Sequence, residues 1–364
     1  MNININGSRD YFDKFCKRNN IGLQKIYGEA ASVPQEKTNK WFKKLPNLIK
    51  EYEPKDIFNV DELGLFYRLL PSKTYAEKNK KCFLGKKSKE RITILLGSNM
   101  DGSEKLDLMI IGKSKNPRCF KNIKNLPVIY KNNSTSWMTN KLFEEYLKIF
   151  NQKMKKEKRQ ILMFIDKCPA HHFVEFSNIK MKFLPENTTS ILQPMDQGVI
   201  KCFKSYYRKR IVKKLIADLM DGKTPDIKNF TLLSCVLIAK LAWNDVKQDT
   251  IKNCFRKCGF NKNQTEESGA EIHVAIESNE WKTFAKLTNI ESGTFSDFVE
   301  VDDSLVTTTE LSLELINQNI MKEIHENDKE DEDDDDDSET EIDEPEETQK
   351  EITMNEVKKS IEVY

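Results

Sequence analysis

The stretch ILMFIDKCPAHH (residues 161–172) has the clearest pattern in the chain, because five apolar residues end on an acid, Asp166. A short run that is apolar throughout is typical of a strand buried at the centre of a sheet. A Cys, a Pro and two His follow at once, and they leave three kinds of site open. These are a metal–thiolate site, a Cys–His nucleophile pair, and one carboxylate of a metal-dependent nuclease.

The thiol and imidazole groups of this stretch fit the first two alternatives poorly. Cys168 and His171 are zinc ligand types, but a structural zinc site needs four ligands and no neighbouring sequence completes it. Catalytic Cys–His pairs usually come from separate segments rather than from positions three apart. Pro169 predicts a turn, so a packed Cys and a capping or solvent-facing His form the plain structural alternative. Cys254 and Cys258 also lack a second ligand pair and are expected to be ordinary thiols.

Apolar spacing divides the rest of the chain into further elements. The expected order is helices in residues 8–52, a strand in 56–71, a hairpin in 91–112, a helix in 138–158, strands in 161–166 and 181–185, and a long helix in 196–220. Strands that come first and then alternate with helices are typical of an α/β or α+β layer fold.

The net charge of +1 conceals an uneven distribution of charge along the 364 residues. Residues 328–347 hold fifteen acids and one Lys, so this block carries −14 and the rest of the chain +15. A basic body with an acidic tail is common in proteins that bind polyanions, and a solvated basic surface is the plainer alternative. The acidic block cannot bury enough apolar surface to fold alone, which predicts a disordered tail over residues 327–364.

Composition also bears on the compartment. No apolar run reaches the length of about 18 residues that a membrane span needs, so no membrane contact is expected. The N-terminal residues MNININGSRD lack the basic and apolar regions of a secretory signal. Eight scattered Cys residues are typical of reduced thiols in a cytosolic or nuclear protein.

Three acids share one sequence context. Asp61 follows the apolar run IFNV, Asp166 follows LMFI, and Asp196 opens the long helix after a loop. Carboxylates that converge at one sheet edge repel each other unless cations neutralise them, and oxygen ligands favour Mg²⁺ or Mn²⁺. Two such ions about 4 Å apart can activate water for phosphodiester cleavage. Asp is also a common turn or N-cap residue, so the pattern alone leaves this alternative open.

Longer motifs carry a resemblance to a known family. The segments IFNVDELGLFYRLLP, GSEKLDLMIIGKSKNPRCFKN, LMFIDKCPAHH and FLPENTTSILQPMDQGVIKCFKSYYRKRIV resemble, in order, the transposase domain of the pogo/Tigger branch of the Tc1/mariner superfamily. Jerky-derived proteins and centromere protein B are relatives of that branch. The resemblance implies an RNase H-like fold, with Asp61, Asp166 and Asp196 as catalytic residues that bind two Mg²⁺ or Mn²⁺ ions. The implied reaction is hydrolytic cutting of DNA at transposon ends, followed by attack of the freed 3′-hydroxyl on target DNA.

The N-terminal residues resemble only part of the family's DNA-binding region. DYFDKFCKRNNIGLQKIYGEAASV is similar to the last stretch of its second helix-turn-helix unit. The rest of that region has no counterpart here, so sequence-specific recognition of transposon ends is not expected. Basic residues of this remnant are still expected to contact phosphates, which gives affinity without sequence reading.

Two residues depart from the family pattern near the expected site. Lys167 stands where Asn is usual after the second acid, and its positive charge is expected to weaken cation binding or to contact a phosphate. Leu63 stands where Thr is usual, which removes a hydroxyl that could hydrogen-bond near the site. Both departures favour a copy that is losing full activity.

Basic residues on the helix after the third acid are expected to face the DNA backbone, and a solvated helix face is the alternative. These DNA-binding candidates are Lys201, Lys204, Arg208, Lys209 and Arg210. The acidic tail is expected to bind a protein partner or to compete with DNA for this surface. The segments KKEKR (residues 155–159) and RKR (residues 208–210) are candidate nuclear signals, although nuclear localisation rests mainly on the resemblance. A homodimer is a further hypothesis.

The sequence therefore predicts an α/β protein with four parts. An RNase H-like mixed sheet flanked by helices occupies residues 55–260, behind a helical DNA-binding remnant and linker in 1–54. A partly helical region in 261–326 and the acidic tail in 327–364 follow. The leading hypothesis is a nuclear, DNA-binding transposase derivative with metal-dependent endonuclease and strand-transfer chemistry. The alternative is a catalytically inactive DNA- or chromatin-binding scaffold, and metal-dependent cleavage separates the two.

Overall fold

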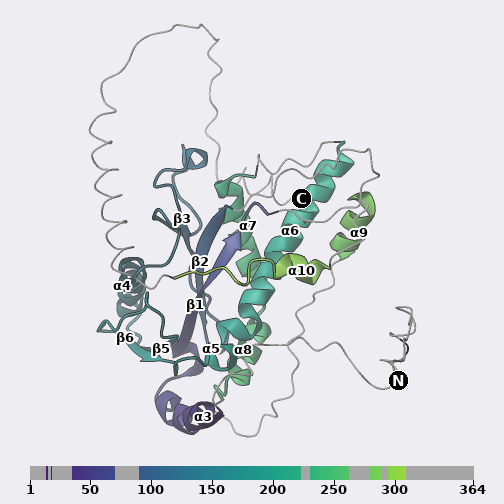
Figure 1. Ribbon diagram of the computed structural model, residues 1–364. Helices are drawn as coiled ribbons and strands as arrows, with labels where there is room; N and C mark the ends of the chain where they lie inside the picture. Colours follow the sequence, from purple (N-terminus) through teal and green to yellow (C-terminus); the bar gives the residue numbers. More distant parts are fainter. Residues whose placement is uncertain are drawn as a thin grey trace, which may run out of the picture.

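The computed structural model describes residues 14, 18, 35–69, 90–222, 230–261, 279–288 and 294–308 (Figure 1). The acidic tail and nearly all of residues 1–34 lie outside the described residues, so the predictions made for them stay predictions. The described elements are α3 (Gln35–Ile49), η1 (Pro54–Asp56), β1 (Ile57–Phe66), β2 (Arg91–Asn99), β3 (Met109–Gly112), η2 (Arg118–Phe120), β4 (Ile129–Asn132), α4 (Asn140–Lys156), β5 (Ile161–Ile165), β6 (Ile179–Phe183), α5 (Thr189–Leu192), η3 (Met195–Val199), α6 (Ile200–Met220), α7 (Leu232–Asp245), α8 (Gln248–Lys257), α9 (Asn279–Thr288) and α10 (Phe295–Val299).

The strands form one mixed sheet in the order β4-β3-β2-β1-β5-β6. β1 is antiparallel to β2 and β2 to β3, whereas β5 runs parallel to both β1 and β6. All five residues of β5 are buried, as expected for a strand inside the sheet. This arrangement confirms the predicted mixed sheet flanked by helices.

Helices cover both faces of the sheet because successive side chains of each strand point to opposite sides. Leu63 and Leu65 of β1 pack in one core cluster with residues of α3, α6, α7 and α8. Phe58 and Val60 pack in a second cluster with α4. Figure 1 shows α6 and α7 on one side of the central strands and α4 on the other. We call these the α6 face and the α4 face.

The packed core extends beyond residues 55–260 at both ends. Trp41, Leu45 and Ile49 of α3 lie four residues apart on one side of the helix and are buried in the α6-face cluster. The ring of Trp41 meets Phe164 of β5 edge-on, with 6.1 Å between the ring centroids. Phe284 of α9 is buried in the same cluster. The domain boundaries remain a prediction, but these helices belong to the core that the sheet organises.

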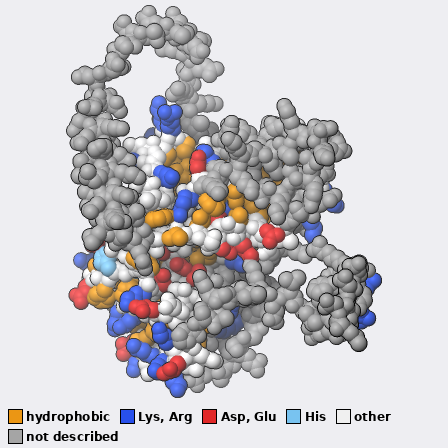
Figure 2. Space-filling model, viewed as in Figure 1, with side chains coloured by type: hydrophobic (Ala, Val, Ile, Leu, Met, Phe, Trp, Pro, Cys, Tyr) orange, Lys and Arg blue, Asp and Glu red, His pale blue; other side chains and the backbone are white. Residues whose placement is uncertain are grey.

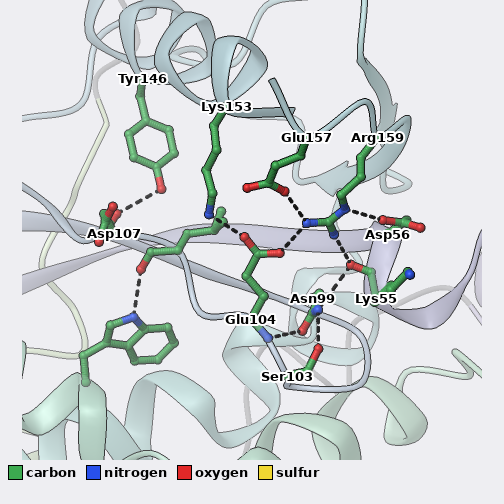
Figure 3. A network of polar contacts seen from close by, with 12 residues as sticks. Lys55, Asp56, Asn99, Ser103, Glu104, Asp107, Tyr146, Lys153, Glu157 and Arg159 are labelled. Carbon is green, nitrogen blue, oxygen red and sulfur yellow. Dashed lines mark hydrogen bonds and ion pairs between the residues drawn. The ribbon is translucent and has the colours of Figure 1, made fainter. Parts of the chain in front are cut away.

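A charged cluster joins the elements at the edge of the sheet where β1 begins (Figure 3). Glu104, in the β2–β3 connection, accepts from Lys153 of α4 at 2.6 Å and from Arg159 at 2.8 Å. Arg159 also binds Asp56 at 2.8 Å and the carbonyl oxygen of Lys55 at 2.8 Å. One guanidinium group therefore connects the segments that enter β1 and β5.

Residues 300–308, which we call the C-terminal strap, cross the sheet after α10. The amide of Phe66 donates to Asp302 Oδ2 at 3.1 Å, and Met138 N donates to Thr307 O at 2.8 Å. A Cβ atom at Gly64 would lie 2.5 Å from Leu305 Cβ, so the strap approaches β1 closely enough to require glycine there. Figure 1 shows the strap running from α10 across β1 and β2.

None of the helices among the described residues combines the length and the apolar character needed to cross a bilayer.

Candidate functional site

The structure brings Asp61, Asp166 and Asp196 together. Asp61 lies in β1, and Asp166 directly follows β5, the parallel neighbour of β1. The pairing of Asn59 with Phe164 places the two acids at the same level of the sheet, because the strands run in the same direction. Asp196 lies in η3, where it is close enough to hydrogen-bond the carboxyl group of Asp61.

Asp196 reaches this position through an irregular turn ahead of α6. η3 is a π-helical turn, a type of irregularity that is frequent at functional sites. Gly198 has a φ of 146° within this turn, a conformation open to glycine and strongly disfavoured for other residues. The sequence predicted one regular helix over 196–220, whereas α6 starts at Ile200. The π-helical turn precedes it and holds the third acid.

Like charges dominate the electrostatics of this cluster. Asp61 is only 8% exposed. Burial raises its pKa well above the ordinary value of a carboxyl, and the charges of Asp196, Asp166 and Glu62 raise it further. The hydrogen bond with Asp196 acts in the same direction. Without a cation, these carboxyl groups are easiest to accommodate when they share a proton. Their oxygens are the donors that hard divalent cations prefer, so the residues present fit Mg²⁺ or Mn²⁺.

Two buried amides hold the elements that carry the acids. Asn59 donates to Phe164 O at 2.9 Å and to Gln193 Oε1 at 2.8 Å. Its carbonyl oxygen accepts from Met195 N at 3.0 Å, and Gln193 donates to Val60 O at 3.3 Å. Sequence reasoning gave Asn59 and Gln193 no role, although both stand in quoted motifs two or three residues before an acid. A polar residue in an otherwise apolar strand was the available signal.

A second polar cluster lies on the other side of Asp166. His171 Nε2 lies 3.0 Å from Glu62 Oε1, and its Nδ1 lies 2.7 Å from Asp166 Oδ1. Burial alone lowers the pKa of His171, but the facing carboxylates of Glu62 and Asp166 outweigh it and raise the pKa well above its ordinary value. The ring also packs on Phe143, at 4.1 Å between centroids. His171 therefore lies between the carboxyl groups of Glu62 and Asp166 and contacts both.

This cluster corrects one premise of the zinc alternative. Glu62, Asp166, Cys168 and His171 place one ligand atom each within 4.8 Å of one another, so four potential ligands do exist. In the metal-free structure both nitrogens of His171 already face carboxylate oxygens, at 3.0 Å and 2.7 Å. Burial raises the pKa of the Cys168 thiol, which disfavours the thiolate that zinc requires.

The departures at Lys167 and Leu63 are explained by local packing. Lys167 forms an ion pair with Glu186, and both side chains are exposed. Glu186 therefore offsets much of the positive charge next to Asp166. Leu63 is 3% exposed and belongs to the apolar core on the α6 face, where a leucine side chain needs no polar partner.

The predicted DNA contacts of Lys204 and Arg208 are wrong. Their side chains are 3% and 0% exposed, and both bind Asp302 of the C-terminal strap, at 2.8 Å and 2.6 Å. Arg208 also donates to Phe66 O at 3.0 Å. The sequence could not reveal this, because the partner lies 94 residues further along the chain. These two cations stabilise the protein's own fold.

The other three predicted cations also meet acids. Lys201 lies 2.8 Å from Glu300, Lys209 lies 3.2 Å from Glu280, and Arg210 lies 2.7 Å from Asp245. Their side chains are 31–38% exposed, so DNA contact by these residues stays a prediction.

Comparison with known proteins agrees with this architecture. Residues 89–255 match the model of the DDE superfamily endonuclease family. Tigger transposable element-derived protein 4 of Mus musculus is 36% identical over 304 residues, which are 82% of this chain and 59% of that protein. CENP-B homolog protein 2 of Schizosaccharomyces pombe is 33% identical over 288 residues, 74% of this chain and 54% of that protein. The chain thus spans little more than half the length of these relatives.

Among solved structures, the Mos1 mariner paired end complex with Mn is similar, with 10% identity, a TM-score of 0.39, and coverage of 69% of this chain and 68% of that one. Residues 89–255, which run from β2 into α8, are similar to a DDE superfamily endonuclease domain. The chain is similar over most of its length to Tigger transposable element-derived and CENP-B homolog proteins.

Proposed function

We propose that this protein is a nuclear, DNA-binding transposase derivative that cuts DNA with Mg²⁺ or Mn²⁺ at Asp61, Asp166 and Asp196. The observation that supports the proposal most strongly is the convergence of these three carboxyl groups at one level of the sheet. Burial and then the neighbouring carboxylates raise the pKa of Asp61, and a bound divalent cation would relieve the repulsion among them.

Each acid has a distinct part in the proposed site. Asp61 and Asp196 bind the metal from the α6 face, where their side chains already meet. Asp166 binds from the end of β5, and His171 orients it through Oδ1, so that its other oxygen is available to the cation. Divalent ions held by these residues would supply the chemistry that activates a water molecule for attack on a phosphodiester and stabilises the leaving oxygen. Strand transfer would use the same residues and is implied by the family alone.

The relatives bear on location and partners. Their printed names include major centromere autoantigen B of Homo sapiens, which is 28% identical over 59% of this chain. We extend DNA binding and nuclear location to this chain as part of the proposal. A homodimer and a protein partner for the acidic tail remain hypotheses.

A second function deserves a test because of Lys167. A Lys replaces the usual Asn beside the second acid, which favours a scaffold that binds DNA or chromatin without cutting it. The ion pair with Glu186 argues against this alternative, since it offsets the charge without moving Asp166.

Nicking of supercoiled plasmid by the full chain, in Mg²⁺ and in Mn²⁺, tests the proposal. The matched control is the Asp166→Asn, Asp196→Asn double variant, which keeps the side-chain size and removes two charges. We expect nicking by the wild type and none by the variant. Equal nicking by both would reveal a contaminating nuclease, and binding without nicking by either would favour the scaffold.

A further inference from the structure

The connection between β3 and β4 has an unusual composition. Residues 113–124, KSKNPRCFKNIK, contain five Lys or Arg residues and no acid. We call this segment the basic loop. Figure 2 shows Lys and Arg side chains gathered above the end of β3, at the top of the described surface in this view.

Three of the five basic side chains of the loop are both exposed and away from the acids of the described residues. Lys113, Arg118 and Lys121 are exposed. None of these three forms an ion pair with an acid in the part of the chain that the structure describes. Exposed cations without acidic partners attract a polyanion, and the free energy gained comes from released counterions.

The backbone of the basic loop is held in place rather than extended into solvent. Phe120 packs edge-on against Tyr130 of β4, with 4.9 Å between ring centroids. The hydroxyl of Tyr130 donates to Ser114 O at 2.7 Å, and Phe120 N donates to Pro117 O at 2.8 Å. A Cβ atom at Gly112 would lie 2.5 Å from the Tyr130 hydroxyl, so the loop leaves β3 in close contact with that ring. A preorganised loop loses little entropy when it binds.

The basic loop lies at the same edge of the sheet as the acids. β3 runs in the same direction as β1, because each is antiparallel to β2. Register places Gly112 level with Leu65, four residues beyond Asp61 and two strands away. Strand geometry then gives a separation on the order of 15–20 Å, about five base pairs of duplex. η2 of the loop contacts α7, and Phe120 packs on the α6-face cluster, so the loop lies on the same face as Asp61.

A cavity of about 620 Å³ adjoins the basic loop. Lys113, Arg118, Arg68 and Arg91 are among the residues that line it. Among the described residues that line it, Glu90 is the one carboxylate, and it pairs with Arg68 at 3.2 Å. The cavity therefore continues the positive surface of the loop towards the core.

We propose that the basic loop binds the phosphate backbone of DNA and holds the duplex beside the three acids. This inference rests on the proposed function for the identity of the polyanion, whereas the surface itself follows from Lys113, Arg118 and Lys121. Contacts of this kind bind without reading sequence, so the loop supplies affinity and orientation.

The test measures binding of the full chain to a fluorescently labelled 30-base-pair duplex of random sequence, by anisotropy over a range of salt concentrations. The variant carries Lys113→Gln, Arg118→Gln and Lys121→Gln. Its matched control carries Lys155→Gln, Lys156→Gln and Lys158→Gln, which removes the same charge from exposed residues at the other end of the sheet. We expect the loop variant to bind at least about tenfold more weakly, with a salt slope smaller by about two to three. The control should bind nearly like the wild type.

Equal losses in the two variants would mean that net charge alone matters, and this would overturn the inference. Equal DNA affinity of the wild type and the loop variant would overturn the role of the basic loop without affecting the proposed function. A wild type that binds no DNA would overturn both. An RNA duplex of the same length is assayed in parallel. If the loop variant loses affinity for the RNA duplex alone, RNA rather than DNA is the partner of the basic loop. Thermal melting of each variant checks that the fold is kept.

Discussion

Helix α6 and the basic loop are both rich in Lys and Arg, but the structure places these charged side chains in different environments. Seven of the 21 residues of α6 are Lys or Arg, against five of 12 in the basic loop. In α6, Lys204 and Arg208 are buried against Asp302. In the loop, Lys113, Arg118 and Lys121 are exposed and meet no acid in the described parts of the chain. A basic segment therefore indicates DNA binding only when the fold leaves its charges unpaired.

The largest effect expected from this comparison concerns stability. Asp302→Asn should lower the free energy of unfolding by about 3–5 kcal/mol, because it leaves Arg208 buried without its anionic partner. The triple loop variant should change it by less than about 0.5 kcal/mol, since its side chains are exposed. Urea unfolding followed by tryptophan fluorescence measures both.

Asp303→Asn is the matched control for this experiment. Asp303 directly follows Asp302 and also binds Lys204, at 2.8 Å, but its side chain is 57% exposed. An exposed pair is worth about 0–1 kcal/mol, so this variant should lose little stability. Equal losses for Asp302→Asn and Asp303→Asn would contradict a structural role for the buried pair.

Asp61, Asp166 and Asp196 form a cluster of opposite charge to the basic loop. Their carboxyl groups face one another, so a cation is expected to stabilise the folded protein. For a site of millimolar affinity, 10 mM Mn²⁺ should stabilise the wild type by about 1–2 kcal/mol. Asp61→Asn should lose this effect and be more stable than the wild type without metal, since it removes one of the repelling charges. Thermal melting with and without the ion measures both results, and equal stabilisation of both proteins would contradict binding at Asp61.

The dependence of folding stability on pH is a second test of the repulsion at Asp61. The pKa of Asp61 is raised in the folded state, so the folded protein holds this proton more tightly than the unfolded chain. Stability of the metal-free protein should therefore fall as pH rises from about 4 through the raised pKa. Asp61→Asn should flatten this dependence. The pKa of His171 is also raised, so stability should fall further as pH rises above the ordinary pKa of a histidine. This second loss of stability should remain in the Asp61→Asn variant.

The smallest effect is expected at the exposed cations of α6. A variant with Lys201→Gln, Lys209→Gln and Arg210→Gln should weaken DNA binding by no more than about threefold, because each side chain already has an acidic partner. The loop variant removes the same charge and should lose at least about tenfold. The anisotropy assay compares the two directly. A larger loss for the α6 variant would move the DNA surface from the basic loop to α6.

Much of this protein follows from the sequence by itself. The buried strand at residues 161–165 and the layering of strands with helices could be predicted, because apolar runs and their spacing record which face of each element is buried. The mixed sheet was implied by the resemblance to the family. The motifs containing Asp61, Asp166 and Asp196 marked these acids, which the structure brings together, although Asp61 lies within β1 rather than at its end.

Only the tertiary structure decided how these acids and the basic residues are partnered. The contacts of Asn59 with Gln193, of His171 with Glu62, and of Arg208 with Asp302 join residues about 90 to 135 positions apart. Hydrogen bonds and ion pairs of this kind act over a few ångströms and leave no periodic trace in the chain. The sequence determined which residues are charged or apolar, and the fold determined which charges neutralise one another and which remain free to bind.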